Sequence, residues 1–138
     1  MSADDAHALI AVDDSDPCQA AVRFALDNFW GSKITLLHVV APGIPVTQTR
    51  VYQEAAEQEE IEDHLAEFKQ QFNDAGFDAK YEFAEGTPHN TIVEFAMDND
   101  IDHIFIGSHG RKGIDRVLLG SVAEKVIRRS AVPVTVIR

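Results

Sequence analysis

The chain has 138 residues, and 23 acidic against 12 basic side chains give it a formal charge of −11 at pH 7. This length suits one domain over residues 1–138, and a hydrophobic content of 45% supports a continuous core rather than a disordered chain. No apolar stretch reaches the ~20 residues that a membrane-spanning helix needs, and the negative charge disfavours nucleic acid as a partner. One cysteine and an N-terminus without a signal-peptide pattern predict a cytoplasmic protein.

The charge is unevenly distributed along the chain. Residues 1–106 hold 21 acidic and five basic side chains, whereas residues 107–138 hold seven basic and two acidic ones. The C-terminal segment is therefore the part that would meet an anionic partner, although basic residues late in a helix also complement its dipole. So large an acidic excess also suggests a high-salt cytoplasm, where screening makes the charge tolerable.

The predicted elements alternate between strands and helices. Short apolar runs predict strands over residues 7–12, 33–40, 78–84, 102–106 and 133–137. Apolar residues at helical spacing predict helices over residues 16–30, about 51–75, from Thr87-Pro88 onward, and 121–130, with a loop over 41–49. An Asp16-Pro17 start and a Ser121–Glu124 capping box support two of the helix starts, while Gly31 and Gly76 mark helix ends.

The strands are continuous apolar runs, which is typical of a parallel sheet buried on both faces. The long second helix carries one apolar stripe on an otherwise acidic rod, whose charges are read as a solvated outer face. The order βαβαβαβαβ predicts a single doubly wound α/β domain, with helices on both faces of the sheet. The apolar stripe consists of Ile61, Leu65, Phe68 and Phe72.

The loops that leave the carboxyl ends of parallel strands are where such a sheet binds its ligands. The loop after the fourth predicted strand is rich in glycine and small polar residues, and it runs to a helix start at Gly120-Ser121. Its backbone N–H groups, together with Ser121 and Arg111 or Lys112, suit phosphate, and Asp13 suits a ribose diol. The combination predicts a nucleotide site, although each residue taken alone is better explained by a turn or cap role.

The sequence motifs of other nucleotide-binding, metal-binding and catalytic sites are absent from the chain. The chain has neither a Gly-x-x-x-x-Gly-Lys-Ser/Thr loop nor a Gly-x-Gly-x-x-Gly fingerprint after the first strand. The six histidines show no metal-ligand spacing, so no dedicated metal site is predicted. For an enzyme that used the same pocket, His109 and Asp14 are the only candidate catalytic groups, and they form no convincing constellation.

The spacing Gly107-x-x-Gly110, nine residues, Gly120-Ser121 resembles the Gly-x2-Gly-x9-Gly-Ser/Thr motif of ATP-binding members of the universal stress protein family. The resemblance covers essentially the whole chain. Further matching segments are Ile104-Phe105-Ile106, Leu36-Leu37-His38-Val39, Gly86-Thr87-Pro88-His89 and residues 131–137.

The resemblance implies a five-stranded parallel sheet of order 3-2-1-4-5 with four helices, the adenine nucleotide alpha hydrolase-like fold. It implies ATP as the cofactor, with Mg²⁺ or Mn²⁺ bound through the phosphates, and a homodimer through the last strand, where Pro133 is compatible with an edge. It also implies that Asp13 contacts the ribose and Val39 the adenine. The remaining implied nucleotide contacts are Gly107, Ser108, His109, Gly110, Arg111, Gly120, Ser121 and Val122.

Three functions are compatible with these features. The first is a stress-response regulator in which ATP occupancy shifts a conformation or a partner interface. The second is a slow ATPase or phosphotransferase that uses the same pocket. The third is a dimeric interaction module without nucleotide, against which the intact glycine motif argues.

Overall fold

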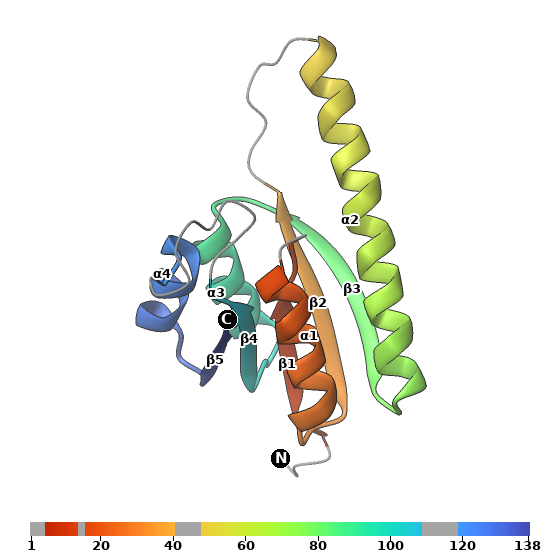
Figure 1. Cartoon of the computed structure of the whole chain (residues 1–138). Coiled ribbons are helices and arrows are strands. Elements are labelled where there is room, and N and C mark those ends of the chain that lie inside the picture. Colours follow the sequence, from red (N-terminus) through yellow and green to blue (C-terminus); the bar gives the residue numbers. More distant parts are fainter. Residues whose placement is uncertain (1–4, 14–15, 41–47, 109–118) are drawn as a thin grey trace.

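A computed structural model describes residues 5–13, 16–40, 48–108 and 119–138, with the backbone alone for Asp16 and residues 48–58. No helix among these residues is long and apolar enough to cross a bilayer. The elements in chain order are β1 (His7–Ala11), α1 (Asp16–Asn28), β2 (Lys33–Val40), α2 (Gln48–Asp74), β3 (Asp78–Glu85), α3 (Pro88–Asp98), β4 (His103–Gly107), α4 (Ser121–Arg129) and β5 (Val134–Ile137) (Figure 1).

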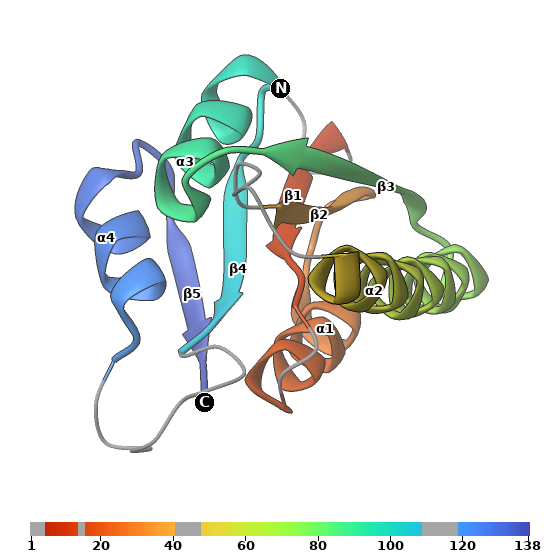
Figure 2. The ribbon, with the colours of Figure 1, turned by 90° about the horizontal axis from the view of Figure 1, so that it is seen from above.

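The strands form one parallel sheet in the order β3-β2-β1-β4-β5, which confirms the predicted topology. Helices α1 and α2 cover one face, and α3 and α4 cover the other (Figure 2). From β1 the chain builds outward to β3, and then crosses to β4 on the other side of β1. The strand order therefore reverses between β1 and β4, where a doubly wound sheet opens a crevice at its carboxyl edge.

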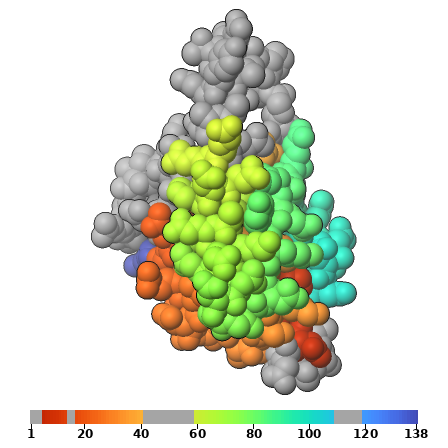
Figure 3. Space-filling view, turned by 90° about the vertical axis from the view of Figure 1, so that its right-hand side faces the viewer, coloured from red at the N-terminus to blue at the C-terminus, as the bar shows by residue number. Residues whose placement is uncertain are grey.

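Two apolar layers hold the helices to the sheet. Beneath α1 and α2 lie the largest buried side chains, and the four residues of the predicted α2 stripe are all at most 9% exposed. Leu9, Ile104 and Val126 are fully buried in the layer beneath α3 and α4. Figure 3 shows α2 lying along β3 at the surface. The acidic side chains of α2 within residues 59–74 are exposed, as predicted.

Two helix boundaries differ from the prediction. Helix α2 begins at Gln48, inside the segment predicted as a loop, because no glycine or proline follows Pro45 there. Helix α1 ends at Asn28, and Gly31 is required by packing rather than by a left-handed conformation. A Cβ on Gly31 would lie 2.5 Å from the Ala6 carbonyl oxygen. Gly76 does end α2 as predicted, with a φ of 98°.

Two histidines are partly buried at the amino edge of the sheet. His7 Nε2 lies 2.7 Å from Thr35 Oγ1, and His103 Nε2 lies 2.6 Å from Thr135 Oγ1. Burial lowers the pKa of both imidazoles, and the charges of Lys80 and Lys33 lower the pKa of His7 further, against the opposing effect of nearby aspartates.

We therefore expect the free energy of unfolding to fall as the pH drops below 6.5, the ordinary histidine pKa. In that range the unfolded chain binds more protons than the folded protein, so stability rises with pH and levels off above it. Urea unfolding followed by the fluorescence of Trp30, at pH values of about 5 and about 7.5, measures this dependence. The double variant His7→Gln, His103→Gln should flatten it, and an unchanged slope would contradict the assignment.

Candidate functional site

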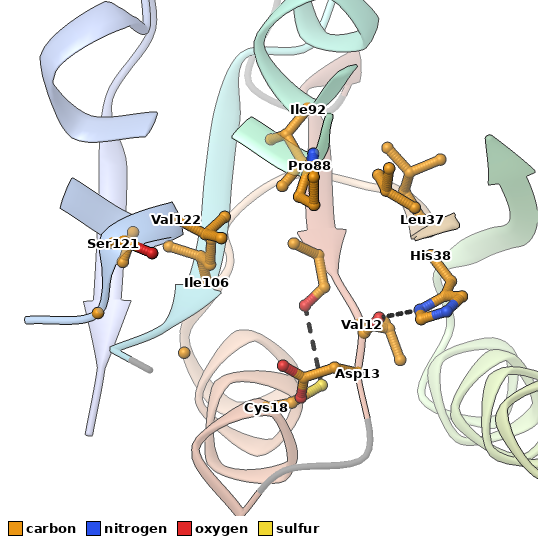
Figure 4. Close-up of a pocket in the computed structure, with 15 residues that line it drawn as sticks. Val12, Asp13, Cys18, Leu37, His38, Pro88, Ile92, Ile106, Ser121 and Val122 are labelled. Carbon is orange, nitrogen blue, oxygen red and sulfur yellow. Dashed lines mark hydrogen bonds between the residues drawn. The ribbon is translucent and has the colours of Figure 1, made fainter. Parts of the chain in front are cut away.

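A cavity of about 220 Å³ opens at the carboxyl edge of the sheet, at the point where the strand order reverses. Its walls come from the ends of β1, β2 and β4 and from the first turns of α1, α3 and α4 (Figure 4). This is the position at which open α/β sheets bind ligands, so the fold and the cavity agree on where a ligand would lie.

Apolar side chains form the inner wall of the cavity. Leu37 and Ile106 reach it from β2 and β4 and are at most 5% exposed, and Ile92 faces it from α3 together with Pro88. A wall of aliphatic groups from several elements, with few polar atoms, suits a flat heteroaromatic ring.

Asp13 enters the cavity directly after β1. Its neighbour Val12 is held by two hydrogen bonds, because its N–H donates to the Leu37 carbonyl at 2.8 Å and its own carbonyl accepts from His38 Nδ1 at 2.7 Å. The Asp13 side chain is half-buried and lies at the cavity wall. A carboxylate is an acceptor-only group when ionised, so this position suits a ligand that offers hydroxyl donors.

The backbone of Val39 also faces the cavity. Alternate residues of β2 turn their N–H and C=O toward β1, since Lys33 N–H donates to Ala6 and the Leu37 carbonyl accepts from Val12. Val39 is the next residue in that series, but the pairing of β1 with β2 ends at Ala11 and Leu37. Within the described part of the chain, the Val39 N–H has no backbone partner on this side. It is available as a donor to a ligand.

The start of α4 lies at the opposite wall, and the predicted Ser121–Glu124 capping box is wrong. Gly120 is the N-cap residue and makes no side-chain cap bond, so Ser121 is already inside the helix. Glu124 instead accepts a hydrogen bond from Arg128 Nε at 3.1 Å. The first N–H groups of α4, from Ser121 to Ala123, therefore have no side-chain cap and lie beside the cavity. Such a helix start favours an anion.

Gly107 and Ser108 both take part in packing and backbone contacts beside the cavity. A Cβ on Gly107 would lie 2.9 Å from the Pro17 carbonyl carbon and 3.0 Å from Cys18 N, so the missing side chain lets α1 start against β4. Ser108 is 2% exposed and is not part of the cavity wall. Its N–H donates to the Ile137 carbonyl and its own carbonyl accepts from Gly120 N–H, which links β5 to the start of α4.

The structure brings most of the described sequence-predicted residues together. Among the residues that the resemblance implied as nucleotide contacts, those that line the cavity are Asp13, Val39, Gly107, Gly120, Ser121 and Val122. His109, Gly110 and Arg111 lie outside the described residues.

Sequence reasoning missed several other cavity residues, among them His38, Cys18 and Ile92. His38 carried a signal, because it is a polar residue near the carboxyl end of an apolar strand. Ile92 carried none, since only the packing of α3 across the sheet brings it there. Cys18 is a small buried side chain, at 2% exposure.

The contact at Gly107 gives a prediction. A Gly107→Ala substitution should lower the free energy of unfolding by about 1–3 kcal/mol, because the added methyl group meets backbone atoms that have little room to move. Urea unfolding at neutral pH measures the change. Wild-type stability in this variant would contradict the close contact between α1 and β4.

Comparison with known proteins agrees with the geometry. The model of the universal stress protein family matches residues 6–138. Universal stress protein MJ0577 of Methanocaldococcus jannaschii is 40% identical over 80 residues, which are 58% of this chain and only 49% of that protein.

Two solved structures share the fold. UspA from Lactobacillus plantarum is 29% identical, with a TM-score of 0.80 over 99% of this chain and 100% of that one. The universal stress protein from Archaeoglobus fulgidus, solved in complex with dAMP, is 24% identical, with a TM-score of 0.69 over 96% and 98% of the two chains. With its sheet order, its cavity and a family match over nearly its full length, the chain belongs to the universal stress protein family.

Proposed function

We propose that this protein is a stress-response regulator that binds an adenine nucleotide, ATP in particular, in the cavity at the carboxyl edge of the sheet. One observation carries the proposal. Three groups lie at a single cavity with an apolar wall: the carboxylate of Asp13, the Val39 N–H and the start of α4 at Ser121. Among the described residues, the Val39 N–H has no backbone partner and the helix start has no side-chain cap. These are the groups that a sugar, a base and a phosphate chain each require.

Each part of the nucleotide has a matching group. The Val39 N–H would donate to adenine N1, while the Val39 carbonyl would accept from the 6-amino group, a pairing that guanine does not offer. The ribose hydroxyls would donate to Asp13. The phosphates would lie on the N–H groups of Ser121 and Val122, where the positive end of the α4 dipole favours negative charge. The dAMP held by the Archaeoglobus fulgidus relative supports an adenine nucleotide as the ligand class.

A divalent ion fits this site only as a companion of the nucleotide. Within the described ranges, no group of three or more His, Cys, Asp or Glu side chains is placed to hold a metal ion. The Ser121 hydroxyl and the phosphate oxygens are the hard oxygen donors that Mg²⁺ and Mn²⁺ accept. The ion would therefore enter with ATP, held mainly through the phosphates.

A regulatory role requires that nucleotide bind two states of the protein with different affinity. The cavity draws its walls from helices on both faces of the sheet, since α1 lies on one face and α3 and α4 on the other. A bound nucleotide would stabilise the arrangement of these helices, and through it a surface that a partner recognises. We assign this role to the cytoplasm, where ATP is available and the thiol of Cys18 stays reduced.

The phosphate position is tested by a Ser121→Asp variant. An acidic residue in the first helical turn favours the helix but repels phosphate, so we expect ATP affinity to fall by roughly tenfold or more while adenosine affinity stays constant. Titration calorimetry with both ligands, in the presence of Mg²⁺, measures the difference.

The matched control is Ser121→Asn. Asparagine has the size of aspartate but no charge, so this variant should retain most of the ATP affinity. Equal ATP affinity in the Ser121→Asp variant and the wild type would contradict the placement of the phosphates. A folded wild-type protein without ATP binding at millimolar nucleotide would refute the proposed function itself.

The proposal includes a homodimer through β5, the edge strand beside β4. Ile104 N–H donates to the Pro133 carbonyl and Ser108 N–H to the Ile137 carbonyl. In a parallel ladder the intervening Val134 and Val136 therefore turn their backbone groups away from β4. An edge of this kind supports pairing with a second β5.

A Val136→Pro substitution should shift the protein from dimer to monomer, because it removes an outward N–H without breaking the ladder to β4. Light scattering coupled to size-exclusion chromatography measures the mass. The control Val136→Thr keeps both the N–H and the branched shape and should stay dimeric. A dimer of unchanged affinity in the proline variant would rule out pairing through this strand.

A further inference from the structure

The imidazole of His38 lies at the point where β1 and β2 stop pairing. Lys33 N–H donates to Ala6 and Val12 N–H donates to Leu37, which fixes the alternation of the ladder. One step further, a regular parallel ladder would have Val39 N–H donate to the Val12 carbonyl. Among the described residues that bond is absent. His38 Nδ1 lies 2.7 Å from the same carbonyl oxygen (Figure 4).

This contact shows which nitrogen of the His38 ring carries the proton. A carbonyl oxygen is only an acceptor, so Nδ1 must carry a hydrogen and donate it. In the neutral imidazole, Nε2 is then the bare nitrogen. The side chain therefore acts toward Val12 as a substitute for a backbone N–H.

The surroundings hold the imidazole in this position. His38 is half-buried, and its ring packs edge-to-face on Phe83 of β3, with centroids 5.9 Å apart and an interplanar angle of 84°. Val12 is 4% exposed, so its carbonyl needs a partner within the protein. If His38 did not donate to the Val12 carbonyl, the backbone donor that a regular parallel ladder would supply is the Val39 N–H.

We propose that His38 is a positioning residue that caps the end of β1 and so keeps the backbone of Val39 free to recognise the base. The inference rests on the proposed nucleotide site and extends it. His38 does not touch the base in this scheme. Its hydrogen bond holds the Val12 carbonyl where the β1–β2 ladder ends. The Val39 N–H, which has no backbone partner among the described residues, then stays directed at the cavity, where adenine N1 would accept it.

The test compares His38→Leu with His38→Asn. Leucine fills space without donating, whereas the asparagine amide nitrogen is as many bonds from Cα as Nδ1 and restores a donor to Val12. Each protein is titrated with ATP, with 1-deaza-ATP, which lacks the N1 acceptor, and with 7-deaza-ATP, which keeps it. The wild type should bind ATP roughly five- to tenfold more tightly than 1-deaza-ATP, the usual effect of one lost hydrogen bond.

In His38→Leu we expect this preference to fall to near unity, because Val39 N–H can then pair with Val12. The His38→Asn variant should recover the preference, and binding of 7-deaza-ATP should follow that of ATP in all three proteins. A merely structural role for His38 would weaken all three nucleotides alike. A wild-type preference retained in His38→Leu would overturn the proposal.

A second measurement is independent of ligand binding. Long-range proton–nitrogen correlation spectra of the wild type should show the neutral His38 ring protonated at Nδ1, and the opposite tautomer would overturn the proposal. A wild type that binds no ATP would refute the proposed function while leaving this tautomer test valid. The two failures are therefore distinguishable.

Discussion

The parallel pairing of β1 with both of its neighbours is the constraint on which the rest of the structure depends. β1 pairs with β2 on one side and β4 on the other, and Leu9 and Ile10 at its centre are fully buried. Because all strands run in the same direction, their ends meet at one edge of the sheet. The chain builds from β1 to β3 on one side of β1 and then crosses to β4 on the other side, so a crevice forms where the strand order reverses.

The site is built from groups that the fold leaves unsatisfied. Val39 lies two residues past the end of the β1–β2 ladder, and the N-cap of α4 is Gly120, which has no side chain to act as a cap. Glycine at an N-cap, in place of a side chain that caps, costs roughly a few tenths of a kcal/mol. A ligand that binds only the folded state adds stability that grows with the logarithm of its concentration. The backbone groups that reduce stability at this edge are therefore the same groups that the proposed nucleotide would use.

Much of the fold could be predicted from the sequence because its apolar patterns are strong. The run around Phe105 and the stripe around Leu65 are continuous enough to define a strand and a helix, and both are buried as expected. The boundaries of the helices were harder to predict from the sequence. The start of α4 at Ser121 was predicted, but its N-cap is Gly120 rather than Ser121, because the Ser-x-x-Glu pattern is also compatible with a serine inside the first turn.

The site was predictable only in part, for a related reason. Asp13 and Ser121 could be found because they follow a strand or open a helix, which are positions that sequence patterns mark. The contribution of Val39 comes from its backbone, and no side-chain pattern encodes an unpaired N–H. The requirement for glycine at Gly107 comes from Pro17, about ninety residues away in the chain, so it depends on a tertiary contact that local reasoning does not reach.

The contact between Gly107 and the start of α1 has a mechanical consequence. Helix α1 has 13 residues and is therefore about 20 Å long. Its first turn adjoins the cavity, and just beyond its last turn Trp30 packs on Phe29 at a centroid distance of 5.3 Å. Because Gly107 is in close contact with Pro17, a displacement of the cavity wall would shift the first turn of α1. A rigid helix would pass that shift on to its other end. The single indole of the protein is carried at the other end, 59% exposed to solvent.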